Sequence, residues 1–201
     1  YFGVPFVPED LERWTRLLGP GRMHAAWDGD RIVGGAGAYA HELTVPGGTV
    51  PAAGVTVVGV LPTHRRRGIL RAMMRAQLDA VRERGEPVAW LWASEETIYG
   101  RFGYGMASLC GELNLPKPAT AFARPLQRRG ELRLVGEEEA YAPFAQIYDA
   151  VRRSQPGMLA RSEDWFRLRR LADPEHRRHG AGPLHRVLLR IDGEPAGYAL
   201  Y

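Results

Sequence analysis

Residues 56–105 constrain the fold of this chain more than any other stretch. An apolar run ends at Pro62 and is followed by the basic sequence Arg65-Arg66-Arg67-Gly68. A helical pattern then runs over about 68–84, with its apolar side chains on one stripe, and a second apolar strand is predicted at 87–93. Strand, basic turn, helix and strand in this order predict a βαβ unit whose helix begins at an anion-binding turn.

The turn before this helix has the chemistry of a phosphate site. The first N–H groups of a helix have no intrahelical partner, and the helix dipole adds about half a positive charge at that end. Gly68 lets a phosphate approach the backbone, and Arg65, Arg66, Arg67 and Arg71 can add charge-assisted hydrogen bonds. A solvated basic surface turn is the alternative for the arginines alone, but the strand before and the helix after favour the anion site.

Composition narrows the class of protein. The 201 residues, 45% hydrophobic and 25% charged, suit one globular domain or one and a half small ones. No apolar run approaches the roughly 20 residues of a membrane helix, so we expect no membrane partner. The single cysteine, Cys110, excludes an internal disulfide and indicates a reducing, cytoplasmic compartment, although a chain that begins at Tyr1 leaves room for a preceding signal. The six histidines lack metal-ligand spacing, and no metal site is expected.

The net charge of +4 comes almost entirely from arginine, and Lys117 is the only lysine. Arginine binds planar oxyanions through two hydrogen bonds at once, which favours phosphate or nucleic acid as a partner, although a GC-rich genome would produce the same bias. We expect the arginine run in 161–178 to be a helix face or an oligomer surface rather than a nucleic-acid site.

The rest of the chain predicts two related halves. Expected elements are a helix at 9–18, strands at 22–27 and 31–41, a strand at 54–61, a strand at 106–115, a strand from 131, helices at 138–154 and 162–172, and a hairpin at 186–201. Residues 163–201 repeat the order of 10–40: a helix with a tryptophan, a strand, an Asp-Gly turn and a strand with small residues. The predicted division is a first domain at 1–116, a linker at 117–130 and a truncated second copy at 131–201.

Two motifs carry a resemblance to a known family. The sequence Val60-x-Pro62-x-x-Arg65-Arg66-x-Gly68-Ile69 resembles the acyl-CoA loop of the GCN5-related N-acetyltransferases (GNAT), and Ile98-Tyr99-x-x-x-Gly103-Tyr104 resembles the aromatic segment after that family's fifth strand. The run from Pro62 to Gly105 is more similar still to the enhanced intracellular survival (Eis) subfamily of actinobacteria. Leu70 departs from the signature, which has Gly or Ala there. The resemblance implies an α/β GNAT fold, a mixed central sheet flanked by helices, with a partial second GNAT-like repeat and with its first strand missing.

The resemblance also assigns the cofactor residues. Acetyl-CoA would bind through strand backbone and the basic loop, with the pantetheine arm bordered by two further residues. These positions are Val58, Gly59, Val60, Arg65, Arg66, Arg67, Gly68, Ile69, Leu70, Arg71, Ser94 and Glu95.

Tyr99 is the predicted catalytic residue, because a tyrosine hydroxyl can protonate the departing thiolate of CoA. Tyr104 is the rival, although its spacing is typical of the packing aromatic of the motif. The general base stays open. Glu95 or Glu96 could act through a water or could simply be helix N-terminal residues. The resemblance to Eis implies a base supplied by the natural C-terminal carboxylate of such proteins, whereas Tyr201 corresponds to an internal strand of the second copy. Trp14 matches a substrate-pocket tryptophan, or else lies on the apolar face of its helix.

The implied reaction is direct acetyl transfer from acetyl-CoA to a primary amine, either an aminoglycoside-like polyamine or a protein lysine. A catalytically silent acyl-CoA-binding or assembly module is the main alternative, and a basic nucleic-acid binder is the third. The resemblance further implies a homo-oligomer, a hexamer in the family, and also allows secretion.

Overall fold

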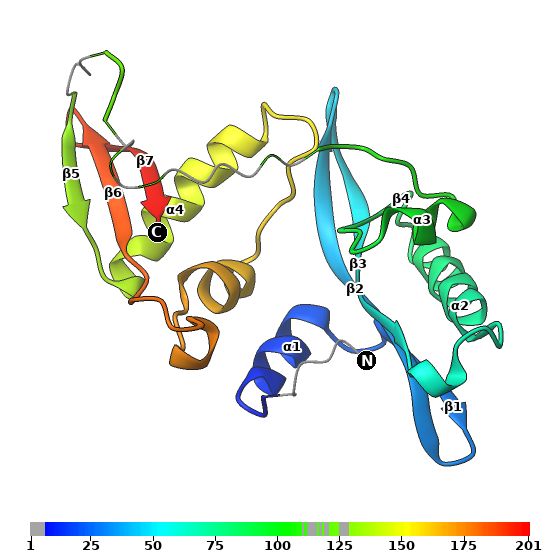
Figure 1. The fold of residues 1–201 in the computed structure, drawn as a ribbon. Coiled ribbons are helices and arrows are strands. Elements are labelled where there is room, and N and C mark those ends of the chain that lie inside the picture. Colours follow the sequence, from blue (N-terminus) through cyan, green and yellow to red (C-terminus); the bar gives the residue numbers. More distant parts are fainter. Residues whose placement is uncertain (1–6, 110, 112–115, 117, 119–120, 125–128) are drawn as a thin grey trace.

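A computed structural model describes residues 7–109, 111, 116, 118, 121–124 and 129–201. The strands form two separate sheets, one of four strands in the order β1-β2-β3-β4 and one of three in the order β5-β6-β7. Each sheet has its own helices, so the chain folds as two units that lie side by side (Figure 1). Among the described residues, no helix is long and apolar enough to cross a membrane.

The first unit contains, in chain order, α1 (Asp10–Leu18), β1 (Met23–Asp28), β2 (Arg31–Val45), β3 (Gly48–Val60), a 3-10 turn (Pro62–His64), α2 (Ile69–Glu83), β4 (Val88–Leu91), α3 (Glu96–Tyr99) and a 3-10 turn (Gly100–Phe102). The second contains β5 (Glu131–Leu134), α4 (Glu137–Arg152), a π-helix (Trp165–Leu171), a 3-10 turn (Glu175–Arg177), β6 (Arg186–Ile191) and β7 (Glu194–Leu200).

The first sheet is antiparallel except at its last pair. β1, β2 and β3 form consecutive hairpins, and β4 pairs parallel with β3 after the α2 crossover. The predicted βαβ unit is therefore confirmed. β3 begins at Gly48, earlier than the predicted 54, because it pairs with β2 from the turn onward, starting with Val45 opposite Gly48.

Small residues bring α2 close to this sheet. Ala38 and Ala53 are fully buried beneath the helix, and a side chain at Gly34 would lie 3.0 Å from the Cε of Met73. The buried face of α2 consists of Met73, Met74, Gln77 and Val81. Met73, Met74 and Val81 of the predicted apolar stripe are buried, while the fully buried Gln77 was not expected.

The second unit has an aromatic core. Phe144 of α4 is fully buried and stacks on Tyr198 of β7, with ring centroids 4.3 Å apart. The predicted helix at 162–172 is present, but its main part is a π-helix, closed by a hydrogen bond from the Ala172 N–H to the Arg167 carbonyl. The wider turn brings Phe166 and Leu171, five residues apart, into the same core.

The predicted strand at 106–115 is wrong over the residues that the structure describes. Residues 106–109 and 111 form no strand, and residues 110 and 112–115 lie outside the described part of the chain. Met106 and Leu109 are exposed by 73% and 82%, so these apolar side chains are not buried in a sheet. β4 is also shorter than predicted and ends at Leu91 rather than 93.

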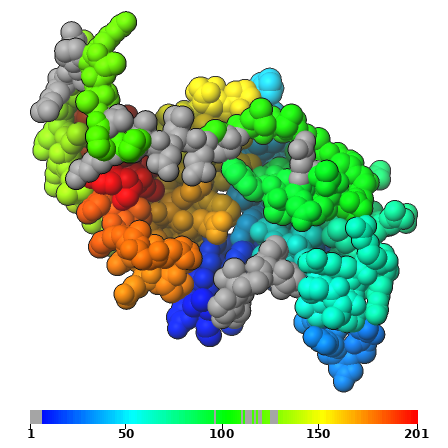
Figure 2. Space-filling view, viewed as in Figure 1, coloured from blue at the N-terminus to red at the C-terminus, as the bar shows by residue number. Residues whose placement is uncertain are grey.

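The two units are joined through the outer side of β2. Residues 157–160 run beside the end of that strand, where the Thr44 N–H donates to the Met158 carbonyl and the Ala160 N–H to the Glu42 carbonyl, at 2.9 and 2.8 Å. An ion pair between Arg16 of α1 and Asp164 adds to the contact. Figure 2 shows α1, in blue, against the gold helical segment of the second unit.

Candidate functional site

The N-terminus of α2 is open to solvent at the predicted phosphate loop. Gly68 precedes the helix with φ of 82°, a left-handed conformation that favours glycine. No atom lies within 4 Å of the position that a Cβ would occupy there. The backbone N–H groups at the start of α2 therefore face a space that an anion can enter, which fits a pyrophosphate group.

The loop arginines surround this space with exposed side chains. Arg65, Arg66, Arg67 and Arg71 are all exposed. Asp28, at the β1–β2 turn, lies 3.0 Å from the Nε2 of His64 and 3.9 Å from the Nη1 of Arg67. These contacts hold the loop against the end of the first hairpin, so the cationic groups remain near the helix N-terminus.

β3 and β4 separate beside this loop. Their last pair is Val55 opposite Leu91, after which β3 continues for five residues to Val60 while β4 ends. Val57 has φ of 48°, and the register of β2 against β3 shifts between Gly35 and Gly37, so β3 bends at this point. The segment 58–60 thus extends past the end of β4, and the two parallel strands part at their carboxyl ends, which is where open α/β sheets bind ligands.

Tyr99 and Tyr104 lie beyond the end of β4. Their rings meet edge to face with centroids 6.0 Å apart. Burial, followed by the negative charge of Glu95, raises the pKa of Tyr99, so its hydroxyl keeps its proton at neutral pH. Ser94 and Glu95, in the turn before α3, are exposed.

Tyr104 is placed differently from Tyr99. Its ring packs against the core beneath α2, together with Val58 and Leu91. Burial, with a contribution from Tyr99, raises the pKa of Tyr104 to about 12. Tyr104 is therefore a packing residue of the core beneath α2. The Glu96 side chain lies outside the part of the chain that the structure describes.

The opposite face of the first sheet carries aromatic side chains. Alternation along the strands puts Ala38, Ala53 and Val55 under α2 and therefore turns Tyr39 and Trp90 the other way. Trp14 of α1 stacks on Tyr39 at 6.2 Å between ring centroids. The half-buried Trp14 is thus separated by the sheet from the loop arginines.

The second unit contributes to this aromatic face. Trp165, at the start of the π-helix, contacts Tyr39 and His41 edge to face, with centroids 5.0 and 4.6 Å away. Sequence reasoning did not single out Tyr39, His41, Trp90 or Trp165. The alternation of Tyr39 and His41 in β2 was a usable signal for two of them, whereas the approach of Trp165 depends on how the units dock.

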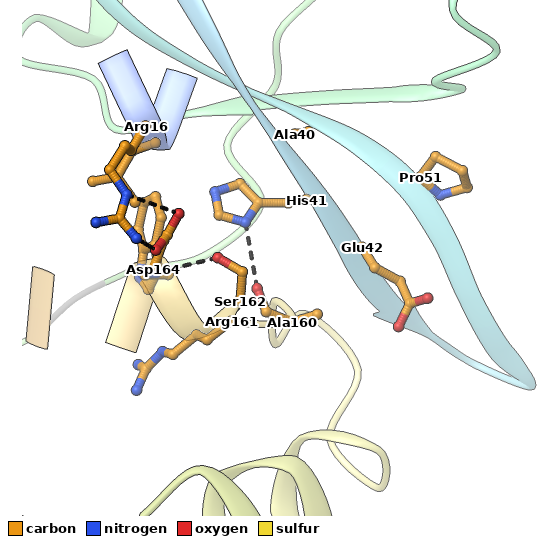
Figure 3. A pocket seen from close by; sticks show the side chains of 11 residues that line it. Arg16, Ala40, His41, Glu42, Pro51, Ala160, Arg161, Ser162 and Asp164 are labelled. Carbon is orange, nitrogen blue, oxygen red and sulfur yellow. Dashed lines mark hydrogen bonds and ion pairs between the residues drawn. The ribbon is translucent and has the colours of Figure 1, made fainter. Parts of the chain in front are cut away.

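A cavity of about 430 Å³ opens beside this cluster, between α1, β2 and residues 160–165 (Figure 3). The Nδ1–H of His41 donates to the Ala160 carbonyl at 3.4 Å, and burial lowers the pKa of His41. The cavity is lined by Arg16, Leu17, Ala40, His41, Glu42, Pro51, Ala160, Arg161, Ser162, Asp164 and Trp165. None of the predicted site residues is among them, so the cavity is distinct from the predicted acetyl-CoA site. Within the described ranges no His, Cys, Asp and Glu side chains gather in a metal-binding group.

These features define an acyltransferase-type α/β fold, and the comparisons with known proteins agree. The family model described as "Acetyltransferase (GNAT) domain" matches residues 1–107, and the chain belongs to this GNAT family. Within the family it is Eis-like. It is 37% identical over 206 residues to the N-acetyltransferase Eis of Mycobacterium tuberculosis, covering 96% of this chain and 49% of that protein.

Other relatives are likewise matched over about half of their length. An uncharacterized N-acetyltransferase of Streptomyces avermitilis is 44% identical over 202 residues, covering 99% of this chain and 49% of the relative. The crystal structure of Eis1 from Mycobacterium abscessus superposes with a TM-score of 0.71 at 36% identity, over 98% of this chain and 47% of that one. The chain therefore spans about half the length of the relatives that it matches.

Proposed function

We propose that this chain carries the acetyl-CoA-binding and proton-donating part of an N-acetyltransferase that acetylates primary amines by direct transfer. The observation that carries the proposal is the parting of β3 and β4 beyond the Val55–Leu91 pair, with the open N-terminus of α2 following β3 and Tyr99 following β4 along the chain. Acetyl-CoA supplies the activated thioester, and the residues of this chain bind it and hold the proton. The boundaries 1–116, 117–130 and 131–201 belong to the same proposal.

The binding residues divide by the part of acetyl-CoA that they would contact. Backbone groups of Val58, Gly59 and Val60 offer an unpaired strand edge to the pantetheine amides. The pyrophosphate would lie on the first turn of α2, at Gly68, Ile69, Leu70 and Arg71, with Arg65, Arg66 and Arg67 adding charge. Ser94 and Glu95 would border the pantetheine arm.

Tyr99 would protonate the leaving group. When the amine nitrogen bonds to the acyl carbon and the carbon–sulfur bond breaks, the thiolate takes the proton from the Tyr99 hydroxyl. The raised pKa keeps that proton in place before transfer. The amine must also lose a proton, and we assign no residue to that step because Glu95 is exposed and equally suited to a position before α3.

The acceptor would approach from the aromatic face, with Trp14 as a pocket wall. Aromatic rings attract cationic groups, which suits an aminoglycoside-like polyamine or a protein lysine. The proposed protein is a homo-oligomer in the cytoplasm, without membrane or nucleic-acid partners. The likeness to Eis supports this part of the proposal.

Substitution of Tyr99 by phenylalanine tests the mechanism. In the full-length protein we expect Tyr99→Phe to lower kcat about 100-fold, the low end for loss of a general acid, while the Kd of acetyl-CoA changes less than about twofold. Thiol release with several amines measures the rate, and calorimetry measures binding. Tyr104→Phe is the matched control and should retain most of the turnover.

The same measurements separate the alternatives. If Tyr99→Phe turns over at the wild-type rate, Tyr99 is not the acid. Binding of acetyl-CoA without thiol release from the wild type would instead identify a catalytically silent acyl-CoA-binding module.

A further inference from the structure

His64 is the one shielded side chain in the basic turn that precedes α2. All other residues of 62–68 are exposed, whereas the His64 side chain is only 12% exposed. Its imidazole ring has a partner on each side: Nδ1 lies 2.8 Å from the Thr63 hydroxyl oxygen, and Nε2 lies 3.0 Å from Oδ2 of Asp28. Because an ionised carboxylate only accepts hydrogen bonds, Nε2 carries a proton and donates it to Asp28. One ring therefore connects the turn to the end of β1.

The backbone that follows His64 adopts a conformation that needs such support. Arg66 has φ of 63°, in the left-handed region that a residue with a Cβ rarely adopts unless its surroundings hold it there. Gly68, two residues later, is also left-handed, with φ of 82°. Asp28 contacts the turn on both sides of Arg66, through His64 at 3.0 Å and through Arg67 at 3.9 Å. One carboxylate thus holds the turn at two points that enclose its least favourable residue.

The negative charge of Asp28 is unexpected beside a phosphate site. The side chain is 62% exposed and stands next to a turn of exposed arginines. A carboxylate in this position repels a phosphate and offsets part of the arginine charge. By charge alone Asp28 should weaken the binding of an anion, so any contribution that favours binding must come from the position that it gives to the turn.

We propose that Asp28 and His64 are positioning residues for acetyl-CoA, which hold the basic turn and the N-terminus of α2 in the arrangement that receives the pyrophosphate. The inference rests on the proposed acetyl-CoA site and adds two residues that lie outside its binding set. Their effect is preorganisation, because backbone N–H groups and guanidinium groups that are already in place lose less freedom when the ligand binds. Affinity should therefore depend on a hydrogen-bond acceptor at position 28 and not on its charge.

Asp28→Ala separates position from charge in the full-length protein. Charge alone predicts tighter acetyl-CoA binding in this variant, whereas loss of the His64 contact should weaken binding about tenfold, as for one charge-assisted hydrogen bond. Calorimetry measures the Kd of acetyl-CoA. Asp28→Asn keeps an oxygen that accepts from Nε2 and should bind within about twofold of wild type. Asp30→Ala removes an exposed carboxylate of the same hairpin turn, and this matched control should not weaken binding.

Two acyl donors show whether the effect is confined to the pyrophosphate. S-acetylpantetheine has the thioester and the pantetheine arm but lacks the pyrophosphate and the adenosine. We expect Asp28→Ala and His64→Ala to raise the KM of acetyl-CoA about tenfold while kcat stays nearly unchanged. With S-acetylpantetheine, kcat/KM should stay within about twofold of wild type, measured by thiol release. An equal fall with both donors would show that the two residues only stabilise the fold.

The outcomes also separate this inference from the function on which it rests. If Asp28→Ala binds acetyl-CoA as tightly as wild type or more tightly, the positioning role is wrong and the acetyl-CoA site stands. Wild-type protein that binds no acetyl-CoA would overturn both. His64→Ala serves as the second variant if urea unfolding shows that Asp28→Ala does not fold, and its acetyl-CoA affinity should fall by the same factor.

Discussion

The two units follow a similar order of helix and hairpin but bury different side chains. The first sheet buries Ala36, Ala38, Ala52 and Ala53 completely, whereas the core of the second unit is built from Phe144, Phe166, Leu171 and Leu188. Small residues let α2 lie close to the first sheet and place its N-terminus beside the ends of the strands. Bulky rings fill the space between α4 and the second sheet. The first unit thus leaves the ends of β3 and β4 apart, while the second fills its interior with bulky side chains.

The arginine side chains of the two units also differ in their surroundings. The loop arginines of the first unit are exposed near a helix N-terminus, where an anion gains most. Most arginines of the second unit instead hold carboxylates, as Arg152 does with Glu42 and Asp149 at 3.0 and 2.6 Å. The arginines therefore differ between the units: those of the loop are exposed and available to an anion, whereas most of those in the second unit pair with carboxylates.

Phe144→Ala should have the largest effect on this comparison. Phe144 is fully buried and stacked on Tyr198, so its truncation should cost about 3–5 kcal/mol of the free energy of unfolding. Acetyl-CoA affinity should stay within about twofold while the protein remains folded, because the proposed acetyl-CoA site belongs to the first unit. Urea unfolding and calorimetry measure the two quantities. Met74→Ala, fully buried under α2, is the control that should weaken both. Loss of acetyl-CoA binding in Phe144→Ala would show that the units do not act separately.

The sequence predicted the first unit better than the docking of the second. The loop, the helix and the parallel strand pair are set by local patterns within 56–105, and local patterns survive folding. The aromatic face escaped prediction because Trp165 reaches Tyr39 only through contacts between residues more than 100 positions apart. The strand predicted at 106–109 is absent and its apolar side chains Met106 and Leu109 are exposed, so apolar residues alone do not establish a strand. The π-helix was predicted as an ordinary helix, because the five-residue spacing of Phe166 and Leu171 is set by the core that they share.

Asp10→Asn addresses how the units are held together. Asp10 of α1 lies 3.1 Å from Arg13 and 2.6 Å from Arg177 of the second unit. Burial alone would raise the pKa of Asp10, but hydrogen bonds and charge from both arginines outweigh it and lower the pKa to about 2. This stability is fully present above the unfolded pKa of about 4 and is lost as pH falls through the folded pKa.

At neutral pH we therefore expect Asp10→Asn to cost on the order of 2 kcal/mol, since Arg13 is largely buried and loses its partner. Denaturation between pH 7 and pH 2 should show the wild-type advantage shrinking below about pH 4. Glu12→Gln, on the exposed side of α1, is the control for a general charge effect. An Asp10→Asn penalty that persists unchanged at pH 2 would contradict the ion-pair explanation.

Gly68→Ala tests the open loop. A Cβ meets no protein atom there, so the cost to folding comes only from φ of 82°, about 1 kcal/mol. A phosphate at the helix N-terminus would meet the new methyl group, and we expect acetyl-CoA to bind about tenfold more weakly. Gly136→Ala is the matched control, because Gly136 precedes α4 with φ of −71° and open space. Unchanged acetyl-CoA affinity in Gly68→Ala would place the pyrophosphate elsewhere.

Tyr104→Phe should have the smallest effect at neutral pH and should distinguish the role of Tyr104 from that of Tyr99. The Tyr104 hydroxyl is buried without a hydrogen-bond partner among the described residues, so its removal should change stability by less than about 1 kcal/mol. Its folded pKa of about 12 exceeds the unfolded value of 10. The contribution of this proton is fully present below pH 10 and is lost as pH rises toward 12, because the unfolded chain releases its proton first. Wild type should therefore lose stability relative to Tyr104→Phe between pH 10 and pH 12, measured by urea unfolding. If the two proteins lose stability in parallel over that range, the Tyr104 hydroxyl is accessible to water. That result would contradict the packing role that distinguishes Tyr104 from Tyr99.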